Sequence, residues 1–147
     1  MTLIEIMLVM VVVGILLAIA VPNFTSQVSK GDRHRAIVDI EALQARINVY
    51  RAEFAACPQT LANAQADPEH LIDPWGNPYQ YLAFCDATKI PKGTARKDKF
   101  LVPINSDYDL YSMGPDGASV SPLTAKPSRD DIVRANDGAF IGLASDY

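Results

Sequence analysis

The chain opens with an almost unbroken apolar run. Residues 6–21 carry no polar side chain, and Glu5 is the only ionisable side chain before Phe24. As an α-helix, residues 6–21 span roughly 24 Å, and including residues 1–5 gives about 32 Å, enough to cross the ~30 Å hydrocarbon core of a bilayer. The pattern therefore predicts a hydrophobic helix over residues 1–23 that anchors the chain in a membrane.

Two other interpretations of this run stay open. A secretory signal peptide would have basic residues before the run, and none are present, although cleavage after Ala18 or Ala20 fits the small-residue pattern. A plain single-span anchor would leave Glu5 without a role. Glu5 is therefore the residue that distinguishes these possibilities from a helix that meets a partner.

Glu5 points to such a partner. A carboxylate within an apolar helix is costly in a membrane, and such residues usually mark a function. The chain itself is not expected to supply a convenient partner for Glu5, whereas the Met1 ammonium group of a neighbouring chain, shifted along the helix axis, would neutralise it. We expect Glu5 and Met1 to set the register between stacked helices during assembly.

The next segment has helical periodicity. Apolar residues recur at intervals of 3 or 4 from Ile37 onward, with charged residues off the stripe, and Pro58 ends the pattern. We expect the helix to continue from about Phe24 to Ala56 and to bury the stripe as an ordinary core face, formed by Ile37, Ile40, Leu43, Ile47, Tyr50 and Phe54.

Turn residues and short strand-like runs follow Cys57, where most of the prolines and glycines lie. Residues 79–84 and 108–112 alternate as half-buried antiparallel strands do, whereas the proline in residues 100–104 favours an edge strand or an irregular loop. The pattern predicts an α+β fold. A long N-terminal α-helix packs on a small antiparallel sheet of three or four strands, within a loop-rich head formed by residues 24–147.

Charge and motif content exclude several functions. The net charge is −4, and Lys and Arg form no basic stripe, so nucleic acid is not an expected partner. The sequence contains no recognisable nucleophile and base arrangement, phosphate loop or dinucleotide fingerprint, which predicts a protein that is not an enzyme. His34 and His70 are expected to be surface residues rather than metal ligands.

The N-terminus resembles a known family. Met1-Thr2-Leu3-Ile4-Glu5-Ile6, with the apolar run and Pro22, resembles the mature N-terminus of the type IV pilin superfamily. The resemblance implies that prepilin peptidase has removed a basic leader and that Met1, where the family commonly has phenylalanine, is N-methylated. It also implies that residues 1–23 pack in the core of a helical filament after leaving the membrane.

Gly14 and Pro22 bracket a weak part of this helix. Glycine lowers helix stability and proline removes a main-chain hydrogen bond, although membrane helices tolerate both residues. In filaments of the family that this sequence resembles, the corresponding segment often unwinds. We therefore expect residues 15–21 to melt and extend on assembly.

Two later motifs narrow the resemblance. Residues 73–79, Asp-Pro-Trp-Gly-Asn-Pro-Tyr, predict a structured turn that enters a strand. Residues 108–117 contain a strand followed by a Gly-Pro-Asp-Gly turn, and residues 128–132 contain an acidic pair. All three segments are similar to the G-type major pseudopilin of type II secretion systems.

In that family the last two segments fold around calcium. The resemblance implies that Asp116, Asp130 and Asp131 bind the ion, with the main-chain carbonyls of residues 110–113 as further candidate ligands, because a hard cation prefers carboxylate and carbonyl oxygens. Residues 118–127 depart from the family pattern, since they lack glycine and carry only one charge, on Lys126. This departure affects the set of calcium ligands that the resemblance implies.

Cys57 and Cys85 are the only cysteines. The resemblance places the head in the periplasm, an oxidising compartment in which a disulfide is expected. A bond between the two would tie residues 58–78 to the sheet, and two free thiols are the alternative.

The resemblance implies a structural subunit that polymerises into a pseudopilus and drives type II secretion of folded proteins across the outer membrane. Its implied partners are further copies of itself, minor pseudopilins, the inner-membrane assembly platform and prepilin peptidase. Before assembly it would span the inner membrane once, with a periplasmic head. A type IV pilin that forms a surface fibre is the first alternative. A monomeric membrane-anchored binding protein is the second, and Glu5 disfavours it.

Overall fold

A computed structural model describes residues 2–85 and 93–147, with backbone only for residues 22, 23 and 25. The chain divides into two compact units, Met1–Asp32 and Arg33–Tyr147. One helix, α1 (Leu3–Phe54), contributes to both units. The sequence places the end of the hydrophobic segment at residue 23, and the head unit begins later because the first buried side chain described along α1 is Ala36.

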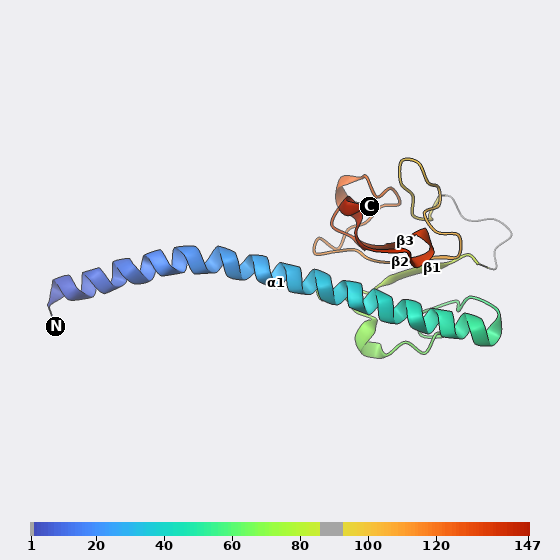
Figure 1. Ribbon diagram of the computed structural model, residues 1–147, viewed down its shortest axis with the longest axis horizontal. Helices are drawn as coiled ribbons and strands as arrows, with labels where there is room; N and C mark the ends of the chain where they lie inside the picture. The colour runs from blue at the N-terminus through green and yellow to red at the C-terminus, as the bar shows by residue number, and fades with distance from the viewer. Residues whose placement is uncertain (1, 86–92) are drawn as a thin grey trace. The chain divides into compact units, whose positions relative to one another are not determined.

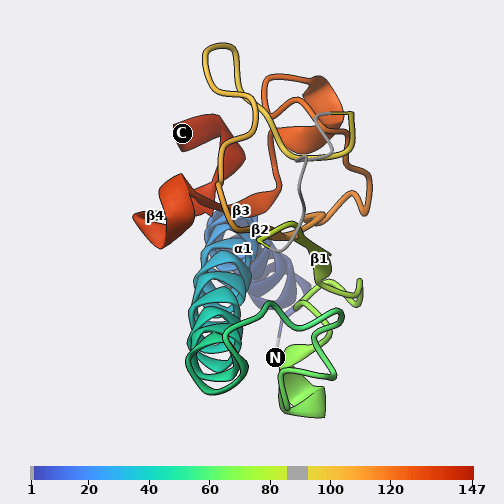
Figure 2. The same cartoon turned by 90° about the vertical axis from the view of Figure 1, so that its right-hand side faces the viewer.

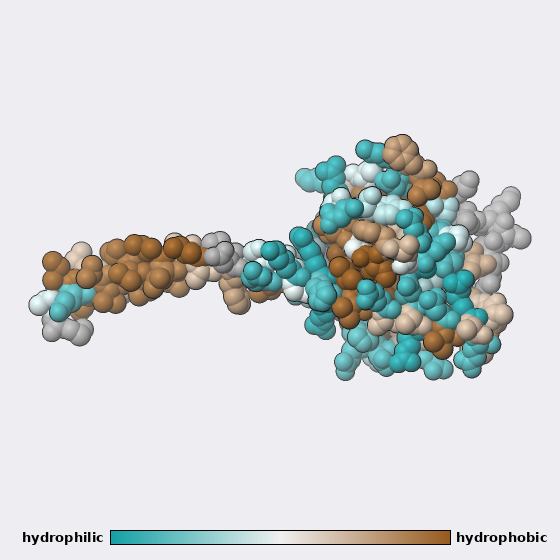
Figure 3. Space-filling view, in the orientation of Figure 1, coloured by the Kyte–Doolittle hydropathy of each residue, from teal (hydrophilic) through white to brown (hydrophobic). Residues whose placement is uncertain are grey.

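The first unit is a single apolar helix. Every side chain described between Leu3 and Val21 is exposed, including large residues such as Leu8 and Ile19. Figure 3 shows this apolar surface as a continuous brown stretch. Because nothing in the described part of the first unit covers these side chains, they are available to lipid or to other helices.

The second unit contains a four-stranded antiparallel sheet in the order β1-β2-β3-β4 (Figures 1 and 2). Leu110 of β2 lies opposite Tyr81 of β1, and Ile132 of β3 lies opposite Leu143 of β4. Every neighbouring pair along the sheet is antiparallel, so the sheet is a meander, as the sequence predicts. The strands are β1 (Gln80–Ala83), β2 (Tyr108–Ser112), β3 (Ile132–Ala135) and β4 (Phe140–Leu143).

The C-terminal part of α1 packs on one face of this sheet (Figure 2). The central residues of the predicted stripe are buried in a core that also contains side chains of β2 and β3. Tyr50 and Phe54, the last two residues of the predicted stripe, are not part of this core: Phe54 is 55% exposed at the end of α1, and its ring lies tilted against that of Tyr50, with the ring centres 4.5 Å apart. The helical residues of this core are Ala36, Ile40, Leu43 and Ile47, and the strand residues are Tyr108, Leu110 and Ile132.

The C-terminal segment forms a second core. Val133 and Ala135 alternate along β3 with Ile132 and Arg134, and they contact the second cluster rather than α1. This cluster also contains Ile104, Leu123 and Ala144, with Tyr111, Phe140 and Tyr147 packed at its edge. Residues 132–147, to which the sequence assigns no role, therefore complete the sheet and its second layer.

Residues 100–104 form no strand, which agrees with the irregular loop that their proline favours. Short 3-10 turns complete the described part of the head, and they comprise Pro68–His70, Lys126–Ser128, Asn136–Gly138 and Ala144–Asp146.

Candidate assembly and stabilising sites

Glu5 has a partner in its own chain, contrary to the sequence-based expectation. Its Oε2 atom accepts hydrogen bonds from the main-chain N–H of Thr2 at 2.6 Å and from the Thr2 hydroxyl at 3.0 Å. This geometry is one half of a capping box, in which the side chain of the third helical residue accepts the main-chain N–H of the residue that precedes the helix. The Thr-x-x-Glu spacing ahead of the apolar run is the sequence signal that indicates it.

The other predicted assembly residues are only partly described. Met1 lies outside the described residues, so its pairing with Glu5 and its N-methylation stay predictions. α1 is helical through Gly14 and position 22 in the single chain, and the side chain of Pro22 is outside the description. Melting of residues 15–21 concerns the assembled state and also stays a prediction.

The turn of residues 73–79 is organised by one buried carboxylate. Oδ1 of Asp73 accepts the main-chain N–H groups of Trp75 at 3.1 Å and Asn77 at 2.8 Å. Its Oδ2 accepts the hydroxyl of Ser112, at the end of β2, at 2.6 Å. Asp73 is 4% exposed, so these bonds satisfy an otherwise costly buried charge and fix the turn to the sheet.

The Gly-Pro-Asp-Gly turn packs between this loop and the acidic pair. The main-chain oxygen of Gly114 accepts a bond from Asn77 Nδ2 at 3.2 Å. Gly114 has φ +66°, and a Cβ atom there would lie 2.5 Å from the carbonyl oxygen of Asp130. Glycine is therefore required at this position, and the two segments that the sequence places around calcium do meet.

The three predicted calcium ligands differ in their surroundings. Asp116 is exposed and its Oδ1 accepts the main-chain N–H of Ala118 at 2.8 Å. Asp130 is partly exposed, and its main chain packs on Gly114. Asp131 is fully buried, and its Oδ2 accepts bonds from the Arg96 guanidinium group and, at 2.5 Å, from the Ser119 hydroxyl.

These side chains do not fit a calcium site built from three aspartates. Among the described residues, no three His, Cys, Asp or Glu side chains lie close enough together to hold a metal ion. The carboxylate of Asp131 already faces a cation, the guanidinium group of Arg96. Burial raises the pKa of Asp131 to about 6, and the Ser119 hydroxyl and the Arg96 guanidinium group act to lower it. Calcium binding stays a prediction, and the geometry disfavours this ligand set.

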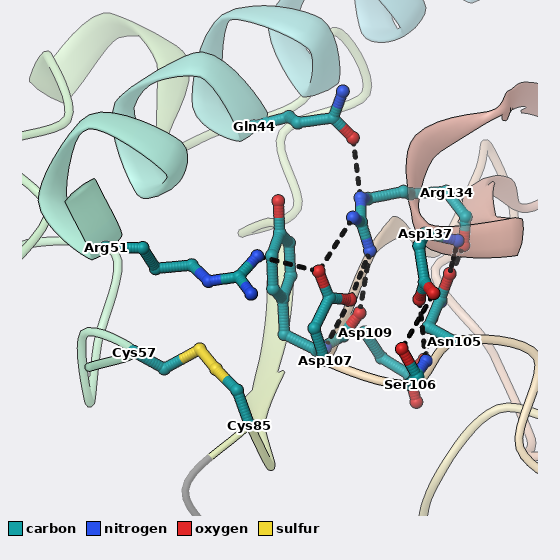
Figure 4. A network of polar contacts seen from close by, with 11 residues as sticks. Gln44, Arg51, Cys57, Cys85, Asn105, Ser106, Asp107, Asp109, Arg134 and Asp137 are labelled. Atoms are coloured by element: carbon teal, nitrogen blue, oxygen red, sulfur yellow. Dashed lines mark hydrogen bonds and ion pairs between the residues drawn. A yellow bond between two sulfur atoms is a disulfide. The ribbon is translucent and has the colours of Figure 1, made fainter. Parts of the chain in front are cut away.

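A second buried ion pair joins the sheet to α1 (Figure 4). Arg134 of β3 donates from Nη1 and Nη2 to the two carboxylate oxygens of Asp107, at 2.9 and 3.1 Å. Its Nε donates to Oε1 of Gln44 at 2.5 Å, and Arg51 donates to Asp107 at 2.9 Å. Because Gln44 and Arg51 belong to α1, this network holds the helix against β2 and β3 through polar bonds as well as through the apolar core.

Tyr108 lies inside this network. The guanidinium carbon of Arg134 is 4.0 Å from the centre of its ring, within the range of a cation–π contact. Burial raises the pKa of Tyr108 to about 12, although Arg134 acts to lower it. Next to it, Asp109 accepts bonds from the Arg96 main-chain N–H at 2.6 Å and from Asn105 at 2.9 Å, and burial raises its pKa.

The helix also carries a buried carboxylate that the predicted stripe omits. Asp39 is 4% exposed and accepts the Tyr79 hydroxyl at 3.1 Å, while its other oxygen lies 2.7 Å from Nδ1 of His70. His70 is partly exposed and contributes to the polar packing of the head. Among the described residues, His70 and Asp39 belong to no group of three or more metal-binding side chains. Burial and the Asp39 carboxylate raise the pKa of Tyr79.

Cys57 and Cys85 form the predicted disulfide, with their Cα atoms 6.1 Å apart (Figure 4). The bond joins the segment after α1 to the second residue after β1, and it closes a loop with a sequence separation of 28. In the chain-entropy model such a loop contributes about 3–4 kcal/mol to stability.

Replacing both cysteines by alanine should therefore lower the free energy of unfolding of the head by about 3 kcal/mol. Urea unfolding of the full chain in mild detergent, followed by fluorescence of the single tryptophan, Trp75, measures this change. Reduction of the unmodified chain should produce the same shift, and the double variant should not respond to reductant. An unchanged urea midpoint in the double variant would contradict a stabilising role.

The described features define a class of protein. An apolar N-terminal helix that runs on into a small α+β head, closed by a disulfide, is the arrangement of pilin-like proteins. Among the described residues, α1 alone is long and apolar enough to cross a membrane. No protein-family model matches the chain.

Known relatives give the particular family. The chain is 35% identical over 135 residues to the type II secretion system core protein G of Pseudomonas aeruginosa, covering 79% of this chain and 82% of the relative. It is 31% identical over 134 residues to the core protein G of Vibrio cholerae, covering 79% and 80%. The corresponding protein of Aeromonas hydrophila is 32% identical over 135 residues, covering 79% and 82%. The chain belongs to the type II secretion core protein G family, the major pseudopilins.

This relationship confirms the resemblance found in the sequence and favours the pseudopilin over the surface pilin. Members of this family are structural pseudopilins rather than enzymes, and type II secretion pseudopilins are proteins of the cell envelope.

Proposed function

We propose that the chain is the subunit that polymerises into a helical pseudopilus, and that growth of this filament drives folded proteins across the outer membrane. The observation that carries the proposal is the 35% identity to a type II secretion core protein G over 79% of the chain. The exposed apolar helix and the disulfide-bonded head support the proposal, because a filament subunit needs an apolar part that packs in the filament core and a stable part that forms its outer surface.

Before assembly, residues 1–23 hold the chain in the inner membrane as a single span, with the head in the periplasm. The exposed apolar side chains of α1 support this step, since they suit lipid and the helices of neighbouring subunits equally well. The basic leader is removed by prepilin peptidase and Met1 is N-methylated.

During assembly, the Glu5 carboxylate gives up its hydrogen bonds from Thr2 of the same chain and pairs with the Met1 ammonium group of a neighbouring subunit. This exchange replaces two hydrogen bonds by a charge-assisted pair, and it fixes the axial step between subunits. Residues 15–21, between Gly14 and Pro22, extend so that the helices fit the filament. Minor pseudopilins and the inner-membrane assembly platform are the other partners of this process.

The test is the protein content of culture supernatant from a strain that lacks this chain, compared with its parent and with a complemented strain. The expected result is loss of specific secreted proteins while surface fibres remain, with secretion restored by the complementing copy. Unchanged secretion together with missing surface fibres would overturn the proposal and assign the chain to the surface pilins.

A further inference from the structure

Arg96 is a buried arginine whose charged group is enclosed by oxygen atoms. The residue is 2% exposed. Its Nη1 atom donates to the Ser119 hydroxyl and to the Val120 carbonyl oxygen, both at 2.6 Å, and its Nη2 atom donates to Oδ2 of Asp131. The guanidinium carbon also lies 4.1 Å from the centre of the Tyr111 ring. A carboxylate, a hydroxyl, a carbonyl and an aromatic face together make a site for a cation.

This site includes part of the sequence motif for which we predict calcium binding. Asp131 belongs to the acidic pair, and Ser119 and Val120 belong to the loop that departs from the family pattern. The oxygens that this loop and this aspartate direct inward are bound to a guanidinium group that the chain itself supplies.

We propose that the guanidinium group of Arg96 is the resident cation of this head, and that it neutralises the Asp131 carboxylate in place of a bound metal ion. The head then keeps its loops in place without calcium. A divalent ion that coordinated Asp131 would lie beside this guanidinium group, and the repulsion between two cations excludes it.

The main chain around Arg96 holds the group in this position. The Arg96 N–H donates to Asp109 Oδ2 at 2.6 Å, and its carbonyl accepts the N–H of Ile104 at 3.0 Å. On the next residue, the Lys97 N–H donates to the Ser121 carbonyl at 3.1 Å. The backbone of Arg96 is therefore bonded to Asp109 of β2 and to Ile104, and that of Lys97 to the loop of residues 119–121, independently of the Arg96 side chain.

Two polar atoms of this pair have no hydrogen-bond partner among the described residues, and their chemistry is complementary. They are Nε of Arg96, a donor, and Oδ1 of Asp131, an acceptor, and both are buried. In a two-bond fork between a guanidinium and a carboxylate, a second N–H donor of the arginine faces the second carboxylate oxygen, and Nε and Oδ1 are a donor and an acceptor of this kind. The chemistry of these two atoms is therefore compatible with an arginine–aspartate pair.

The first test compares thermal unfolding of the full chain in mild detergent with excess calcium chloride and with excess EGTA, followed by Trp75 fluorescence. The expected result is the same Tm in both, and no heat of calcium binding in titration calorimetry. A Tm several degrees lower in EGTA would overturn the proposal, because calcium rather than Arg96 would then be the stabilising cation. This comparison needs no variant and does not depend on filament assembly or secretion.

The second test is a double-mutant cycle. Arg96→Met keeps the length of the side chain but leaves Asp131 as an unpaired buried charge, so its Tm should fall by roughly 10 °C or more. Adding Asp131→Asn to this variant should recover part of the loss, because the isolated charge is then removed. The exposed Arg129→Met is the matched control and should melt like the unmodified chain.

Two outcomes of this cycle would overturn the proposal. One is an Arg96→Met variant that melts at the Tm of the unmodified chain, since a resident cation cannot be dispensable. The other is a double variant no more stable than Arg96→Met, since the loss would then come from packing and not from the charge of Asp131.

Discussion

Replacing Arg134 by methionine should lower the free energy of unfolding of the head by about 3–5 kcal/mol. Arg134 is 2% exposed and binds both carboxylate oxygens of Asp107, which is itself 8% exposed. The variant keeps the aliphatic part of the side chain but leaves Asp107 with Arg51 as its one remaining arginine partner. It also leaves Oε1 of Gln44 without this donor, so part of the loss arises at the contact between α1 and β3.

Urea unfolding of the full chain in mild detergent, monitored by Trp75 fluorescence, measures this loss. Arg46→Met is the matched control, because Arg46 also pairs with an aspartate but lies on the surface, 3.4 Å from Asp67 with more than half of each side chain exposed. Such an exposed pair contributes at most about 1 kcal/mol. Equal losses in the two variants would contradict the idea that burial of the Arg134–Asp107 pair decides its contribution.

The helix and the first two strands could be predicted because their signals are local. The apolar run and the stripe from Ile37 predict a helix from residue 2 to about 56, and α1 covers Leu3–Phe54. Residues 79–84 and 108–112 alternate clearly, and β1 and β2 lie within them. In each case neighbouring residues along the chain carry the whole periodicity.

β3 and β4 could not be predicted in the same way. β3 is Ile-Val-Arg-Ala, in which Arg134 is the one polar residue, so the sequence of this buried strand shows no regular alternation of apolar and polar residues. β4 is short and contains Gly142, which lowers its strand propensity. These segments are strands because they pair with β2 and with each other, and pairing across the fold leaves little trace in a local pattern.

The buried charges show the same limit. Asp131 follows Asp130 in the sequence, which suggests a metal site, whereas its partner Arg96 lies 35 residues away. Asp107 and Arg134 are separated by 27 residues, and only the antiparallel packing of β2 and β3 brings them together. The Thr2–Glu5 capping bond is different, because its spacing is visible in the sequence.

Glu5→Val should still insert into the membrane but should form no filaments, because the register charge in the apolar helix is gone. This result alone would not separate assembly from helix capping, since valine also removes the acceptor of the Thr2 bonds. Glu5→Gln makes the separation. Glutamine keeps an oxygen that can accept the Thr2 N–H and preserves the capping box, but it carries no charge.

If Glu5 pairs with the Met1 ammonium group of a neighbour, Glu5→Gln should fail to assemble as completely as Glu5→Val. Membrane fractionation confirms insertion, and electron microscopy of cells that overproduce the subunit counts filaments. Thr2→Val is the matched control: it removes the hydroxyl bond at 3.0 Å, keeps the main-chain donor and the charge, and should assemble normally. Filaments of Glu5→Gln at the level of the unmodified chain would show that capping suffices and that the charge sets no register. If Glu5→Gln forms no filaments while Thr2→Val assembles normally, assembly requires the carboxylate charge, because Thr2→Val keeps that charge and Glu5→Gln lacks it.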